Sequence, residues 1–372
     1  MKNKTKKKRN RTGWIMVVLV TLAILLTGCQ GQQERKQKTV NVETAQRISF
    51  PESYQYSGEQ VEMNIEKIEP QEAYFINGTA KSIELDCIEI GRMFMPDDGT
   101  NDINMEQKCI LSKEMLGDAH KEIFLWGENS FSYQSNEILK FADSLGETEY
   151  HWNYNLPLFS EKKEFSFGSA EDALEEIMKF LEEAGIRLGD DYKVDIFYLD
   201  YETLREEETY YDMDGNIIDV ESKWEWSEAD NAYLFYIHQS YCGLEDYHYG
   251  KMRKPSAKVY NAQIKVIYNA NGIAEIQVQN LSTYFMGSKQ EKLLDFETIA
   301  QKVCMHYDYI LGNNSYDITS AKLICDFEIP DSNGESKIIP VWEFQITEDT
   351  EGGIQMHYER RFNAITGEIL IN

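Results

Sequence analysis

The chain has 372 residues, of which 64 are acidic and 37 are Lys or Arg, so its formal net charge is −27. This balance excludes nucleic-acid binding, which needs clustered Lys and Arg to neutralise phosphates. An apolar content of 42% excludes disorder throughout the chain. The length exceeds that of one ordinary hydrophobic core, so we expect two or three domains.

The first 28 residues have the pattern of a signal peptide. Seven Lys and Arg residues precede an apolar run of 13 residues from Trp14 to Leu26, and this order is typical of a secretion signal. Leu26-Thr27-Gly28-Cys29 then resembles the lipobox of bacterial lipoproteins. The resemblance implies cleavage before Cys29, a diacylated Cys29 thiol, and a lipid anchor on the outer face of a Gram-positive cell membrane. The alternative is an uncleaved anchor, but a spanning helix needs about 20 residues.

The chain that follows the signal peptide is strongly acidic and begins with a polar segment. Residues 1–28 hold seven positive and no negative charges, so their removal lowers the net charge from −27 to −34. Such a chain is repelled by anionic lipid and wall polymers, and it favours a basic partner or a divalent cation. Residues 29–50 are rich in Gln and Lys and lack an apolar period, which predicts a flexible tether.

Residues 51–160 predict an N-terminal α+β module. Val61, Met63 and Ile65 alternate with polar residues, as in a half-buried strand. The alternation of Ile83, Leu85 and Cys87 predicts a second strand, and Ser135 to Leu145 predicts a short helix.

Residues 161–289 and 290–372 predict two further modules with a common order of elements. Ser169 with Asp172 and Asp295 are candidate N-caps of two helices, which Gly185 and Gly312 end. Strands follow each helix, predicted at 194–201, 233–239, 259–268 and 273–278, and then at 318–329, 341–346 and 356–362. The predicted fold class is therefore α+β, with repeated modules of one helix packed on an antiparallel sheet.

The last third of the chain carries a family resemblance. Val341-Trp342-Glu343-Phe344 and the hairpin Asn363-Ala364-Ile365-Thr366-Gly367-Glu368 are similar to the closing strands of PepSY-like and YycI-type extracytoplasmic domains. They also resemble uncharacterised lipoproteins of Firmicutes. The resemblance implies a binding or regulatory role, through a protease or a membrane sensor kinase, and no catalytic residues. YycI-type proteins keep an uncleaved helix, so this chain departs from them at its N-terminus.

The densest aromatic region contains Trp224, Trp226 and Tyr236. If residues 224–226 form a strand, both tryptophans share one face of it. These residues are the candidate ligand-binding site, a platform for a glycan or a peptide. The alternative interpretation is ordinary core and cross-strand packing.

No catalytic residues, metal site or cofactor are predicted. Asp212 to Asn216 begins like a calcium loop, but Ile217 and Lys223 stand where that loop needs Gly and Glu. His238, Cys242 and His248 offer only three of the four ligands that a tetrahedral zinc site needs, which favours scattered polar residues at the end of a strand. The five cysteines other than Cys29 have no tight spacing, so buried thiols are expected, with a Cys304–Cys325 pair left open.

The sequence therefore favours a non-enzymatic lipoprotein held in the bilayer through acylated Cys29. Its expected partner is another envelope protein, a sensor or a protease that it regulates. The alternative is a lipoprotein that captures a glycan or peptide in the aromatic region around Trp224 and Trp226.

Overall fold

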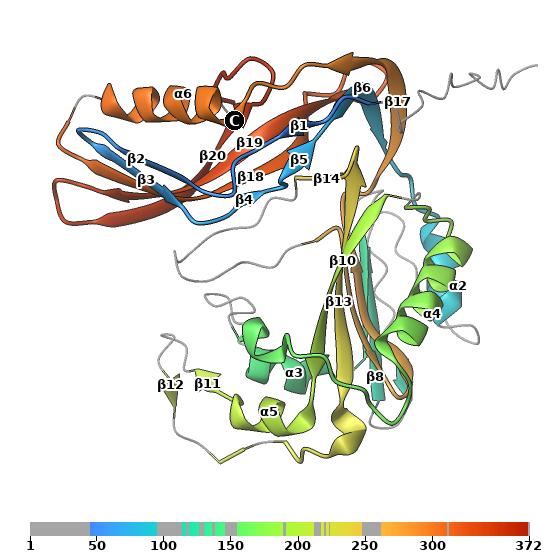
Figure 1. The fold of residues 1–372 in the computed structure, drawn as a ribbon. Helices are drawn as coiled ribbons and strands as arrows, with labels where there is room; N and C mark the ends of the chain where they lie inside the picture. Colours follow the sequence, from blue (N-terminus) through green and yellow to red (C-terminus); the bar gives the residue numbers. More distant parts are fainter. Residues whose placement is uncertain are drawn as a thin grey trace, which may run out of the picture. The chain divides into compact units, whose positions relative to one another are not determined.

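The computed structural model describes most of the chain from residue 45 onward. The described residues are 45–94, 114–116, 119–125, 130–135, 138–145, 155–188, 191–211, 217–218, 221–222, 224–247, 262–310 and 312–370. Strands account for 46% of them and helices for 20%. Two large sheets hold most of these strands (Figure 1).

Sheet I is an antiparallel sheet built from the middle of the chain. Its strands are ordered β10 (Tyr192–Leu199), β13 (Ala232–Tyr241), β15 (Ile264–Asn269), β16 (Gly272–Val278), β9 (Phe131–Ser135), β8 (Ala119–Leu125) and β7 (Glu114–Leu116). The short strand β14 (Leu244–Glu245) extends β13. The hairpin between β15 and β16 turns at Gly272, whose φ of 97° lies in the left-handed region that glycine favours.

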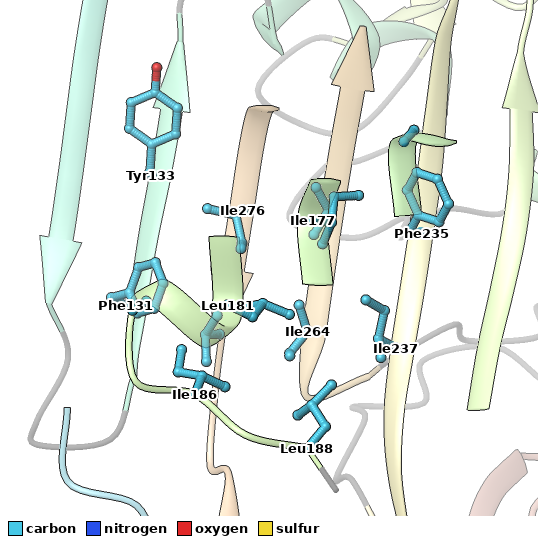
Figure 2. Packing of buried hydrophobic residues seen from close by; sticks show 14 of the residues in the cluster. Phe131, Tyr133, Ile177, Leu181, Ile186, Leu188, Phe235, Ile237, Ile264 and Ile276 are labelled. Carbon is cyan, nitrogen blue, oxygen red and sulfur yellow. The ribbon is translucent and has the colours of Figure 1, made fainter. Parts of the chain in front are cut away.

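Both faces of sheet I are covered by helices. Successive side chains of a strand point to opposite faces, and along β13 Tyr233, Phe235 and Ile237 join one core while Ala232, Leu234 and Tyr236 join another. The first core packs under α4 (Ala170–Glu183) and α2 (Cys87–Phe94), with Ile177 and Leu181 facing the strands (Figure 2). The second packs under α3 (Leu139–Leu145), α5 (Tyr201–Glu206) and the 3₁₀ helix η4 (Leu156–Phe159).

Sheet II combines the two ends of the described chain. Its order is β17 (Ser282–Glu291), β6 (Phe75–Ser82), β19 (Glu335–Asp349), β18 (Ser315–Phe327), β3 (Val61–Ile65) and β2 (Tyr54–Ser57). In addition, β20 (Gln355–Asn363) pairs with β19, and β4 (Ile68–Glu69) pairs with β18. The pairs of β18 with β3 and β4 are parallel. Two-stranded pairs, β1 (Ile48–Ser49) with β5 (Glu72–Ala73) and β11 (Tyr210–Tyr211) with β12 (Ile217–Ile218), complete the strands.

Helix α6 (Phe296–Asp308) covers one face of sheet II. Its buried residues are Phe296, Ile299, Ala300, Val303, Cys304 and Tyr307. The ring of Phe296 packs against Trp342 of β19, with their centroids 4.9 Å apart. The side chains of Val61, Met63 and Ile65 on β3 are each 1% exposed, as the alternation in the sequence predicts.

The predicted fold class, α+β with repeated modules of one helix on an antiparallel sheet, is wrong. The structure is mostly β-sheet, and it is not built from helix-on-sheet repeats. Sheet I has helices on both faces, and sheet II includes parallel pairs. Strands at 54–82 join strands at 282–363, whereas strands at 114–135 join strands at 192–278. The sheets therefore combine strands across the ranges 51–160, 161–289 and 290–372, because periodicity identifies a strand but not its partner.

Several local predictions are confirmed. Ser169 and Asp172 form a capping box at the start of α4, with the Asp172 N–H donating to Ser169 Oγ at 3.1 Å. Asp295 caps α6 by accepting from the Thr298 N–H at 2.8 Å. The strand predicted at Ile83, Leu85 and Cys87 is wrong, because Asp86 accepts a hydrogen bond from the Glu89 N–H and α2 begins at Cys87. Cys242, Cys304 and Cys325 are free and buried, so the Cys304–Cys325 pair is not formed.

Candidate functional site

Cys29, the predicted lipidation site, lies outside the described residues, as do Asp212 to Asn216 and His248. Lipidation of Cys29 therefore stays a prediction. None of the described helices is long and apolar enough to cross a membrane.

Trp224 and Trp226 lie in an irregular segment rather than in a strand, so the predicted shared strand face is wrong. Both side chains are half-buried. The indole N–H of Trp224 donates to Asp143 Oδ2 at 2.9 Å, and that of Trp226 donates to Glu208 Oε2 at 2.8 Å. Both indole N–H groups are therefore bonded within the chain.

Tyr236 belongs to the second core of sheet I, and Trp226 packs against that core. Tyr236 is 2% exposed and contacts Phe197 edge-on at 6.0 Å between ring centroids. The ring of Trp226 packs on the edge of this core, 6.1 Å from Phe141, and the ammonium of Lys140 lies 5.3 Å from its centre. These contacts are those of core packing, and binding of a ligand by the three aromatic residues stays a prediction.

A row of charged side chains crosses the face of sheet II opposite α6. Lys322 on β18, Glu343 on β19 and Arg361 on β20 are direct cross-strand partners. Lys322 also pairs with Glu245 of β14, and Arg361 pairs with Asp326. The guanidinium of Arg361 stacks 4.0 Å from the centre of the Tyr247 ring. This charged row escaped the sequence analysis, because its members are far apart in the chain and meet only through strand register.

Burial changes the protonation of the carboxylates near this row. Desolvation raises the pKa of Asp246 to about 8, and this side chain is 5% exposed with Tyr284 Oη donating to its Oδ2 at 2.8 Å. Desolvation also raises the pKa of Glu343, and the neighbouring carboxylate of Glu359 raises it further. The cations Lys322 and Arg361 oppose that rise. These acids therefore hold protons at a pH where exposed carboxylates are ionised.

The charged row lies where sheet I is joined to sheet II. The Tyr247 N–H donates to the Cys325 carbonyl at 2.8 Å, and the Asp246 N–H donates to the Gln239 carbonyl at 2.9 Å. Glu245 receives Lys193 of β10 at 3.3 Å as well as Lys322 of β18. The charged row and its neighbours are buried or half-buried, ion-paired and bonded through the backbone, so we interpret them as a structural joint that connects the two sheets. Among the described residues no three His, Cys, Asp or Glu side chains are placed to hold a metal ion.

A hollow of about 370 Å³ lies near the beginning of the described chain. It is lined by Gln46, Arg47, Ile48, Ala73, Tyr74, Gln290, Glu291, Lys292 and Leu293. Arg47 lies over the ring of Tyr74, 5.1 Å from its centre. Its lining mixes both signs of charge with apolar groups, which indicates no particular class of ligand.

Several turns meet at one end of sheet II (Figure 1). Asp308 at the end of α6 accepts from Tyr56 Oη at 3.2 Å and from the Gln60 N–H at 3.1 Å. The Glu351 N–H, in the turn between β19 and β20, donates to Asn314 Oδ1 at 3.1 Å. We call the surface formed by residues 57–62, 305–310, 312–317 and 347–356 the tip surface.

The tip surface exposes large apolar side chains. Tyr309 is 76% exposed, Ile354 is 65%, Met305 is 56% and Met356 is 43%. Met305 and Tyr309 are four residues apart around the end of α6 and so project from neighbouring positions. Exposed apolar groups that gather in one region mark contact sites more often than scattered ones do. The sequence analysis missed this surface, because its segments come together only in the fold.

Comparison with known proteins supports the fold and leaves the function open. No protein family matches the chain, and no curated protein matches it. The chain is similar to a solved structure, an uncharacterized protein from Eubacterium rectale, with a TM-score of 0.53 and 17% sequence identity. The alignment covers 87% of this chain and 94% of that one. A likeness at this identity concerns the fold alone.

Proposed function

We propose that this protein is a lipid-anchored, extracytoplasmic binding protein that acts by contacting another envelope protein. In this proposal Cys29 carries the anchor and residues 29–50 are the tether. The folded chain regulates its partner, an envelope sensor or a protease, through binding and without catalysis.

The exposed apolar side chains of the tip surface are the observation that carries this proposal. Burying apolar area drives protein association, and truncation of central anchors in an interface has the largest effect on binding. Tyr309 is the best placed anchor, because aromatic side chains combine large contact area with a polar group. The turns around it are tied to one another by hydrogen bonds that Asp308 and Asn314 accept, so a partner meets a preformed surface.

In-cell photo-crosslinking tests the proposal. A photoreactive phenylalanine replaces Tyr309 in the full-length protein, and adducts are identified by mass spectrometry. The matched control carries the same group at Ile329, which is 93% exposed in the turn between β18 and β19. That turn lies at the opposite end of β18, because Ser315 pairs with Asp349 and Phe327 pairs with Ile338.

We expect one membrane or secreted protein to dominate the adducts from position 309 and to be absent from those at position 329. Equal labelling at both positions, or no protein adduct at position 309, would contradict the proposal.

A further inference from the structure

We infer that the tip surface binds a positively charged polypeptide segment that also carries apolar side chains. This inference rests on the proposed function and names the chemistry of the partner. It follows from the charge of the segments that carry the exposed apolar groups.

The sequence of the tip surface is one-sided in charge. Its segments contain seven acidic residues and neither Lys nor Arg; the acids are Glu59, Glu62, Asp308, Asp317, Glu348, Asp349 and Glu351. In the charged row of sheet II, by contrast, acidic and basic residues are mixed. The tip surface is therefore a local concentration of negative charge.

The acids of the tip surface have no cationic partner among the described residues. Asp308 accepts from a hydroxyl and a backbone N–H. Glu348 accepts from Asn314 Nδ2 at 2.6 Å and from Tyr358 Oη at 3.0 Å. Glu59, Glu62, Asp317 and Glu351 are exposed. Their negative charge is therefore available to attract a positively charged group of a partner.

The arrangement favours one kind of occupant. Two copies of this chain meeting through the tip surface would bring like charges together, which costs several kcal/mol. An anionic membrane is repelled for the same reason. A basic segment pairs with the acidic residues of the tip surface, which accelerates association and selects the partner. Its apolar side chains cover Met305, Tyr309, Ile354 and Met356, which supplies the affinity.

Charge reversal tests the inference with the crosslinker kept at position 309 of the full-length protein. The test variant carries Glu59→Lys, Asp317→Lys and Glu351→Lys. The matched control carries Glu175→Lys, Glu182→Lys and Glu225→Lys, which are exposed residues outside the tip surface and change the net charge equally. We expect the protein adduct to fall at least about tenfold in the test variant and to stay unchanged in the control.

The outcomes separate the inference from the proposed function. A partner adduct that is equally strong in both variants overturns the basic-segment inference and leaves the proposed function standing. Absence of any partner adduct with the native charges in place overturns the proposed function. An adduct of twice the mass of the chain, or a lipid adduct, overturns the inference in favour of a second copy or the bilayer.

A binding measurement tests the same inference without the cell. Two synthetic helical peptides of equal length, one built from Lys and Leu and one from Glu and Leu, are titrated into the full-length protein in detergent. We expect the Lys peptide alone to bind, with an affinity that falls as salt rises and is lost in the test variant. Equal binding of both peptides, or undiminished binding by the test variant, would overturn the inference. Unchanged melting temperatures of both charge variants show that they are folded, as expected for exposed sites.

Discussion

Sheets I and II are similar in size but differ in what covers their faces. In sheet I the central strand β13 is buried on both faces, with Phe235 and Leu234 in separate cores. In sheet II one face packs under α6, and the other carries the row Lys322, Glu343 and Arg361 beside a small buried cluster that includes Val341. Sheet I, with large apolar cores on both faces, contributes mainly to stability, whereas sheet II buries an ion pair on its second face and exposes apolar side chains on its turns.

This difference assigns separate tasks to the two sheets. The exposed apolar groups of the tip surface lie at an end of sheet II. The aromatic residues that the sequence singles out, Trp226 and Tyr236, lie in or beside a core of sheet I. Aromatic density in the sequence therefore indicates packing here, and the candidate contact surface lies in segments of ordinary composition.

Truncation of the sheet I core has the largest expected effect. Phe235 is fully buried in β13, so Phe235→Ala removes its packing and leaves a cavity, at a cost of about 3–5 kcal/mol in the free energy of unfolding. Phe285→Ala on β17 is the matched control, since Phe285 is 42% exposed, and it costs less than about 1 kcal/mol. Urea unfolding measures both. Equal losses would mean that the two sheets do not differ as their burial indicates.

Removal of the Arg361 guanidinium has the next largest effect. The side chain of Arg361 is 7% exposed and that of Asp326 is 12% exposed. Arg361→Ala leaves the buried Asp326 carboxylate without its cation, which costs about 3 kcal/mol. Lys337→Ala is the control, because Lys337 and Glu328 form an exposed pair of the kind that contributes little. Comparable losses in the two variants would show that the charged row is not a buried joint.

Local elements of this fold could be predicted from the sequence, because their signals are local. The Ser169 and Asp295 caps, the apolar stripes of α4 and α6 and the hairpin at Gly272 depend on residues within a few positions of one another. The pairing of β3 with β18 could not be predicted, since about 250 residues separate them and several strands share the same pattern. The prediction of a strand from Ile83 was wrong, because the alternation of three apolar residues was taken as a strand signal and Asp86 was not recognised as the start of a helix.

The candidate site was predictable only in its overall chemistry. A net charge of −27 already favours a basic partner. The place of that contact was hidden, because Tyr309 and Ile354 come from segments that meet only through the turns of sheet II. Likewise Lys322, Glu343 and Arg361 lie across three strands whose register the sequence does not reveal. The grouping of residues into the tip surface and the charged row therefore depends on pairing between strands that are far apart in the chain.

The raised pKa of Asp246 predicts that stability depends on pH through the region where sheets I and II are joined, and not through the two cores of sheet I. The pKa of Asp246 is about 8 in the folded chain and about 3.9 in an unfolded one. The folded state therefore holds a proton that the unfolded state has released between these values. Stability is highest below pH 4 for this group, and it is lost as pH rises toward 8 with a slope of up to about 1.4 kcal/mol per pH unit.

The variant Asp246→Asn removes this titration and keeps the size of the side chain. We expect the free energy of unfolding, measured in urea from pH 5 to pH 8, to vary less with pH than in the native chain. The exposed Glu175→Gln is the control and leaves the native slope in place. If Asp246→Asn keeps the full slope, the pH dependence comes from another group. Glu343→Gln is then the next variant, since burial and Glu359 raise the pKa of Glu343 as well. Whether Asp246 or Glu343 is the source, the pH dependence of stability comes from the face of sheet II that Arg361 and Lys322 share. Phe235→Ala, in contrast, lowers the free energy of unfolding at every pH, because Phe235 packs among the hydrophobic side chains of the first core of sheet I rather than against a group that titrates between pH 5 and pH 8.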